Sequence, residues 1–171
     1  MPNIKMKKRE YKDCNAIFDV MYYCLNHDLR YYNVMYLPVR NDCMKYSAAD
    51  REEEVRYMAD FWNMILDGYN KNSGKRFNHY VIGIGYENHK NHQNVYHYSN
   101  IIPTLLLEYL QENGLFGLVA YHVTSQGYHH IHLMIGITNI YGESMHISPW
   151  TLAIYLNTNI PYLKMQPMED D

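Results

Sequence analysis

The stretch YHVTSQGYHHIHLMIGITN, residues 121–139, constrains the fold of this chain most, because it has the pattern of two strands joined by a tight turn. Apolar and polar residues alternate on both sides of Ser125-Gln126-Gly127. A hairpin loop of this length needs a residue in the left-handed conformation, which glycine adopts without steric cost. We therefore predict two antiparallel strands, over 116–124 and 129–139.

The register of this hairpin gathers three histidines. If Thr124 pairs with Tyr128, then His122 lies directly opposite His130, and His132 lies diagonally from both. Successive side chains on a strand point to opposite faces, so all three imidazoles share one face of the sheet.

The other face of the same strand is apolar. Ile131, Leu133 and Ile135 alternate with the histidines and are expected to pack against helices. His129 falls on this apolar face, so we predict a structural role for it. Two amphipathic helices, over 47–68 and 99–113, are expected to cover this face and to leave the three histidines on the opposite one.

The rest of the chain alternates between further elements. We predict strands over 3–11, 34–40 and 79–86, helices over 14–26 and from 149 onward, and a polar loop over 87–98. Ser47 with Asp50 forms a capping box, Gly114 ends a helix, and Ser148 with Pro149 begins the last one. The sum is an α+β fold, a central antiparallel sheet flanked by helices, with the first strand in a central position.

Length and composition favour one domain over residues 1–171, since 47% of the residues are hydrophobic. No stretch approaches the length of a membrane span, and the basic first twelve residues precede no apolar segment. We therefore expect a soluble cytoplasmic protein without membrane insertion. Cys14, Cys24 and Cys43 are odd in number and lack C-x-x-C spacing, which indicates neither a disulfide framework nor a thiolate metal site.

The formal net charge of −3 disfavours a protein that coats nucleic acid, but the basic residues are not spread evenly. Lys5, Lys7, Lys8 and Arg9 form a basic cluster near the start of the chain. The 19 tyrosines either stack on unpaired bases or reflect a compositional bias.

Three converging neutral imidazoles suit a divalent cation, because each offers one lone pair and leaves coordination positions open for water or substrate. The alternative is that hydrogen bonds alone satisfy these histidines on a half-exposed sheet face. His89, His92 and His97 form either a second metal-binding tract or a solvated loop.

Four segments resemble, in their order, a known family. Val20-Met21-Tyr22-Tyr23-Cys24-Leu25-Asn26 is similar to a V-x-x-Y-hydrophobic-x-N pattern on an early helix. HYVIGIG at 79–85, the H…H-hydrophobic-H pattern ending at His132, and Asn139-Ile140-Tyr141-Gly142 follow. Together they resemble the HUH endonucleases, specifically the MobA/MobL-like relaxases, over roughly residues 3 to 146.

The resemblance implies a metal-dependent DNA-nicking enzyme. His122, His130 and His132 would hold Mg²⁺ or Mn²⁺, and Tyr23 would attack a phosphate of single-stranded DNA at a transfer origin. The product would be a covalent 5′-phosphotyrosine, which such enzymes use in plasmid or mobile-element transfer. Tyr22 is the neighbouring alternative nucleophile.

Further expectations follow from the same resemblance. Lys5, Lys7, Lys8 and Arg9 would hold the DNA backbone, and an accessory DNA-binding protein would be the partner of a chain with an acidic total. Two other functions stay open. One is a three-histidine zinc or iron hydrolase that activates water, and the other is an inactive module that binds single-stranded DNA.

Overall fold

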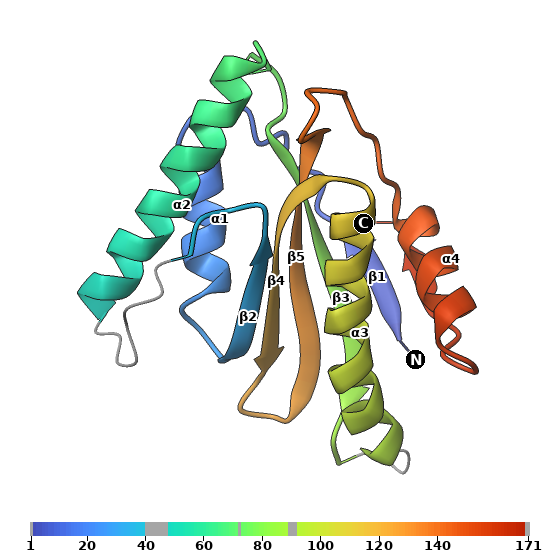
Figure 1. Cartoon of the computed structure of the whole chain (residues 1–171). Coiled ribbons are helices and arrows are strands. Elements are labelled where there is room, and N and C mark those ends of the chain that lie inside the picture. The colour runs from blue at the N-terminus through green and yellow to red at the C-terminus, as the bar shows by residue number, and fades with distance from the viewer. Residues whose placement is uncertain (1, 40–47, 72, 89–91, 170–171) are drawn as a thin grey trace.

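A single mixed sheet organises the chain in the computed structural model, which describes residues 2–39, 48–71, 73–88 and 92–169. The strands are β1 (Asn3–Met6), β2 (Leu29–Met35), β3 (Phe77–Tyr86), β4 (Leu115–Val123), β5 (Tyr128–Asn139) and β6 (Gln166–Met168), and the helices are α1 (Ala16–Cys24), α2 (Ala48–Gly68), α3 (His92–Glu112) and α4 (Pro149–Asn159). The strand order is β2-β4-β5-β3-β1-β6 (Figure 1). The α+β class with a mostly antiparallel sheet is therefore confirmed.

The β4–β5 hairpin has the predicted register. His122 pairs with His130, and the backbone N–H of Thr124 donates to the carbonyl of Tyr128 at 3.0 Å. Gly127 occupies the loop with φ +76°, the left-handed conformation that the short turn requires. β2 and β3 flank this hairpin, and both pair antiparallel to it.

Two predicted helix boundaries are confirmed by their capping geometry. The side chain of Ser148 accepts a hydrogen bond from the backbone N–H of Thr151, and Pro149 occupies the first turn of α4. Gly114 follows α3 with φ +63°. Ser47 and Cys43 lie outside the described residues, and so does His89.

Helices cover both faces of the sheet, in three layers. Figure 1 shows α1 and α2 together on one side and α3 and α4 on the other. One apolar core joins α3 and α4 to the face that carries Ile131 and Leu133, as predicted. A second core joins α1 and α2 to Phe116, Leu118 and Met134, which belong to the same face as the histidines.

The prediction that helices 47–68 and 99–113 share a face was therefore wrong. α2 lies on the histidine face because β4 is apolar on both sides, and its Phe116, Leu118 and Ala120 alternate toward that face ahead of His122. The apolar face of α2, which includes Trp62, packs there. The histidine face is thus covered at one end and carries the imidazoles at the other.

Several boundaries differ from the predictions, mostly at the periphery. β1 ends at Met6 instead of residue 11, and it lies between β3 and β6 rather than centrally. β2 is shifted toward the N-terminus relative to 34–40, and α3 begins at His92 inside the predicted loop 87–98. β6 was not predicted, and it pairs with β1 in parallel. None of the described helices combines the length and apolar character that a membrane crossing needs.

Candidate metal centre and nucleophile

The structure brings His122, His130 and His132 together on the histidine face; we call them the outer triad. One ring nitrogen from each lies within 4.8 Å of the others. The ring centroids are 4.7 to 5.2 Å apart. His122 and His132 are buried, whereas His130 is half-buried, so the group opens toward solvent through His130.

A fourth histidine, His79 of β3, joins this cluster and was missed by the sequence analysis. Its Nε2 lies 3.0 Å from Nδ1 of His132, and its Nδ1 lies 3.4 Å from the hydroxyl of Tyr11. The register explains the contact, since Val81 pairs with His132 and His79 stands two residues before Val81 on the same face. The strand pattern placed His79 on a strand, but it did not say which strand lies beside it.

Burial keeps these histidines neutral. It lowers the pKa of His79 to about 4, with a smaller contribution from the charge of Lys7. Burial lowers the pKa of His132 to about 2, and the neighbouring histidines act in the same direction. The pKa values of His122 and His130 are lowered by burial as well. A neutral imidazole is the form that ligates a metal, so the cluster is ready for a cation at neutral pH.

Each histidine of the outer triad keeps a ring nitrogen that can ligate a metal. The Nε2–H of His122 donates to the carbonyl of Cys24 at 2.6 Å, which leaves the lone pair on Nδ1. If Nδ1–H of His132 donates to His79, Nε2 of His132 is left to ligate. Nδ1 of His130 is buried and has no hydrogen-bond partner among the described residues. These donors fit a divalent cation.

Tyr23, at the end of α1, lies against this cluster. Its ring meets His132 edge-on, with centroids 5.5 Å apart and an interplanar angle of 87°. It is 56% exposed, so a large substrate can reach it. Tyr22 instead stacks on Phe18 of the same helix at 5.5 Å. Of the two adjacent tyrosines, Tyr23 is the one beside the histidines.

Cys24 follows Tyr23 and points into the protein. Its Sγ lies 4.0 Å from Nε2 of His79. It is fully buried, and burial raises the pKa of its thiol. Ligand atoms of Cys24, His79 and His132 lie within 4.8 Å of one another. We call this group the inner triad. Cysteine spacing could not reveal it, because the partners of Cys24 come from β3 and β5.

Asp28 adds a negative charge beside the outer triad. It follows α1 in a left-handed conformation with φ 58°, and its carbonyl accepts a hydrogen bond from the backbone of Val123 on β4 at 3.0 Å. Its charge acts to raise the pKa of His122 and of His130, although burial outweighs this contribution. An exposed carboxylate at this position favours a cation. No sequence pattern singled it out.

The predicted basic cluster divides between two faces. Lys5 pairs with Val81, which pairs with His132, so the side chain of Lys5 lies on the histidine face. Two strand spacings, about 10 Å, separate it from His132. Lys7 is close enough for its charge to lower the pKa of His132. Lys8 instead lines a cavity with residues of α4 and β6.

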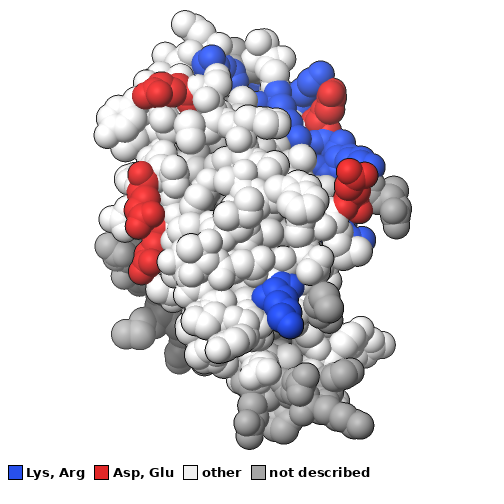
Figure 2. Space-filling view, turned by 90° about the vertical axis from the view of Figure 1, so that its right-hand side faces the viewer, with Lys and Arg blue, Asp and Glu red and all other residues white. Residues whose placement is uncertain are grey.

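Arg9 is exposed beyond the end of β1. Figure 2 shows the side of the molecule that carries α4, where Lys and Arg gather near one corner and most of the remaining described surface is uncharged. Because Lys8 lies against α4 and β6 whereas Lys5 and Lys7 lie toward His132, the basic cluster is not one continuous strip along the histidine face.

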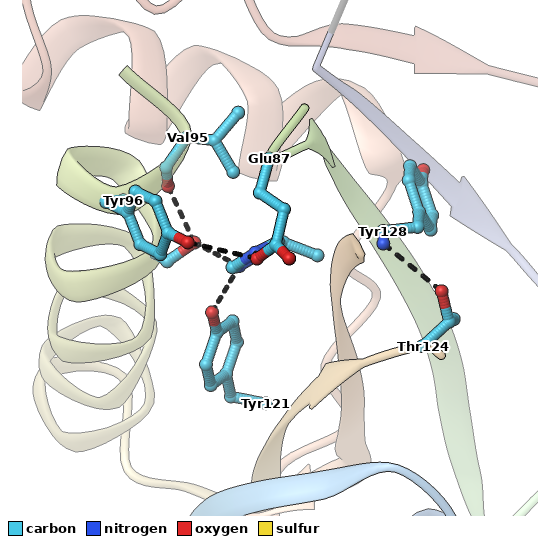
Figure 3. A network of polar contacts seen from close by, with 8 residues as sticks. Glu87, Val95, Tyr96, Tyr121, Thr124 and Tyr128 are labelled. Carbon is cyan, nitrogen blue, oxygen red and sulfur yellow. Dashed lines mark hydrogen bonds and ion pairs between the residues drawn. The ribbon is translucent and has the colours of Figure 1, made fainter. Parts of the chain in front are cut away.

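His129 lies on the α3 face, as predicted from its alternation. Its ring contacts Ser99 Oγ at 3.3 Å, the hydroxyl of Tyr121, and a carboxylate oxygen of Glu87 at 3.0 Å. Figure 3 shows Tyr121 and Tyr96 converging near Glu87, while Tyr128 points away from this network. Both ring nitrogens of His129 thus have hydrogen-bond partners, which accords with a structural role.

A cavity of about 600 Å³ is lined by residues of β1, β3 and α3, by Tyr128 and by the segment after α4, and no residue of the outer triad is part of this lining. Tyrosines contribute much of its lining: Tyr86, Tyr98, Tyr128 and Tyr162. Tyr128 connects it to the triad, because its ring stacks on His130 with centroids 5.6 Å apart and an interplanar angle of 19°. Tyr86 meets Tyr128 at 4.8 Å.

The sequence matches no family model and no curated protein. A solved structure described as "Molecular Basis of Vancomycin Resistance Transfer in Staphylococcus aureus" covers 85% of this chain and 78% of its own, with 19% sequence identity and a TM-score of 0.37. A likeness at that level assigns neither family nor function. The roles of the residues above follow from their chemistry and geometry.

Proposed function

We propose that this protein is a relaxase-like transesterase that nicks single-stranded DNA at a transfer origin through Tyr23. The observation that carries the proposal is the contact between the exposed ring of Tyr23 and His132, a member of a neutral three-histidine cluster. A nucleophile, a set of metal ligands and an open approach thus meet at the end of α1.

The outer triad would hold Mg²⁺ or Mn²⁺. Such a cation polarises a phosphate and stabilises the charge that develops during in-line displacement. His122 and His132 contribute rigidly held imidazoles, since both are buried and hydrogen-bonded. Asp28 adds negative charge that favours the cation, and Lys5 and Lys7 supply positive charge for the DNA backbone.

The reaction exchanges one phosphate ester for another. The phenolic oxygen of Tyr23 loses its proton to solvent and forms a bond to the phosphorus, and the bond from phosphorus to the 3′ oxygen breaks. The 3′ oxygen takes up a proton, which leaves a free 3′-OH and a 5′-phosphotyrosine. Because the bond types are conserved, the reverse step reseals the strand.

The tyrosine-lined cavity supports single-stranded DNA as the substrate. Aromatic side chains stack on unpaired bases with about 1–3 kcal/mol for each base. Tyr86 is 47% exposed and contacts Tyr128, whose ring stacks on His130. A base stacked on Tyr86 would therefore be separated from the proposed metal centre by the ring of Tyr128. An accessory DNA-binding protein would supply the backbone affinity that a net charge of −3 lacks.

A denaturing-gel assay tests the proposal. The protein is incubated with Mn²⁺ and a pool of labelled single-stranded oligonucleotides, and adducts that survive denaturant are counted. We expect a metal-dependent adduct with the wild type and with Tyr22→Phe, and none with Tyr23→Phe. Tyr22→Phe is the matched control, since both changes remove one hydroxyl from adjacent residues of α1.

Each alternative has its own outcome in this assay. Metal-dependent cleavage that leaves a free 5′-phosphate without an adduct, unchanged in Tyr23→Phe, would replace the proposal with the water-activating hydrolase. Retention of the oligonucleotide without turnover in any variant would replace it with the inactive binding module.

A further inference from the structure

We propose that the inner triad, Cys24, His79 and His132, is a second metal site that takes a thiophilic divalent ion such as Zn²⁺. All three side chains are buried, and they come from three different elements, α1, β3 and β5. Their ligand atoms already lie within 4.8 Å of one another. The site differs from the outer triad in its sulfur ligand and in its depth.

The distances suit a tetrahedral ion. With bonds of about 2.0–2.1 Å to nitrogen and about 2.3 Å to sulfur, ligand atoms around zinc lie roughly 3.3–3.6 Å apart. Here the His79–His132 nitrogens are 3.0 Å apart, and Cys24 Sγ lies 4.0 Å from His79. Shifts of a few tenths of an ångström would bring these two separations to the values around zinc, and the ligand atoms of Cys24 and His132 are within 4.8 Å of each other. The ion would replace the proton between the two imidazoles.

The donor atoms of the site determine which ion it would take. Burial holds the thiol of Cys24 protonated and His79 neutral, so the metal-free site contains no charge. A divalent ion deprotonates a coordinating thiol and neutralises the resulting thiolate. Hard ions such as Mg²⁺ and Mn²⁺ prefer oxygen ligands, whereas Zn²⁺ accepts sulfur and imidazole. The sulfur ligand of the inner triad therefore favours Zn²⁺ over Mg²⁺ and Mn²⁺ at that site.

His132 belongs to both triads, so the two ions compete for it. A neutral imidazole has one lone pair, which lies either on Nδ1, facing His79, or on the other ring nitrogen. Zn²⁺ in the inner triad would thus withdraw His132 from the outer one. This competition between ions requires that the outer triad binds metal, as the proposed function states. The existence of the inner site does not depend on it.

Cobalt substitution tests the inner site on the whole chain. Co²⁺ bound to a thiolate gives a charge-transfer absorption in the near ultraviolet, which an all-histidine site lacks. We expect this band in the wild type, in the outer-triad variant His122→Ala and in Cys14→Ala, which removes an exposed thiol. Cys24→Ala and His79→Ala should lose it. No band in the wild type, or a band that persists in Cys24→Ala, would overturn the inner site.

Two further measurements complete the test. Zn²⁺ should raise the melting temperature of the wild type and of Cys14→Ala more than that of Cys24→Ser, a variant close in size to the native residue. Zn²⁺ should also release bound Mn²⁺ from the wild type at a lower concentration than from Cys24→Ala, in which it can compete only at the outer triad itself. Cobalt absorption in a protein that binds no Mn²⁺ would retain the inner site and reject the proposed function. Mn²⁺ binding without cobalt absorption would do the reverse.

Discussion

Acidification should destabilise the metal-free protein, because His79 and His132 are buried in their neutral form. Their pKa values are lowered to about 4 and about 2 in the folded state. In the unfolded chain both titrate near their ordinary pKa of about 6.5. Below that pH the unfolded state binds two protons that the folded state does not, so its free energy falls relative to the folded one.

The magnitude follows from the same pKa values. Between about pH 7 and about pH 5, each histidine should cost roughly 2 kcal/mol of folding free energy, or about 4 kcal/mol for the pair. That is a large share of the roughly 5–15 kcal/mol that stabilises a typical domain. The stability is present above the unfolded pKa and is lost as the pH falls toward the folded values. His122 and His130 should add to the loss, since their pKa values are lowered as well.

Urea unfolding in the presence of a chelator, followed by circular dichroism at the two pH values, measures this loss. His79→Leu should remove about half of the loss assigned to the pair, roughly 2 kcal/mol, whatever its effect on stability at about pH 7. His146→Gln, at an exposed position, is the control and should keep the full pH dependence. Equal unfolding free energies at both pH values, or an undiminished loss in His79→Leu, would refute the reasoning.

Two substitution sets test the packing and the DNA contacts. Gly117→Ala should lower the free energy of unfolding in urea by about 1–3 kcal/mol, because a Cβ there would lie 2.6 Å from the backbone oxygen of Met134. An unchanged free energy of unfolding would contradict the tight packing of β4 on β5. Lys5→Ala and Lys7→Ala should each weaken the binding of single-stranded DNA and reduce its salt dependence, whereas Lys8→Ala should change neither. Fluorescence anisotropy titrations at varied salt measure both quantities. Equal effects of the three substitutions would show that one continuous basic strip holds the DNA.

The hairpin could be predicted from sequence because its information is local. The loop ending in Gly127 fixes the register, and the register alone places His122 opposite His130. The C-terminus of α3 and the N-terminus of α4 could be predicted for the same reason, since Gly114 and Ser148 act on their own neighbours in the chain.

What could not be predicted depends on which elements meet. A strand buried on both faces gives no sign of which helix covers which side, so α2 was assigned to the wrong layer. His79 and Cys24 looked unremarkable in their own segments, and only the β3–β5 pairing and the end of α1 bring them to His132. Asp28 likewise depends on the turn after α1.

Titration of the metal-free protein with Mn²⁺ by calorimetry tests the central claim, that the outer triad is a metal site. We expect one bound ion, with the affinity lowered more than about tenfold, roughly 1.4 kcal/mol, by His122→Ala, His130→Ala or His132→Ala. His129→Ala, on the opposite face of the same strand, should bind as the wild type does. Equal effects at all four positions, or binding that survives the three outer-triad substitutions, would contradict the account.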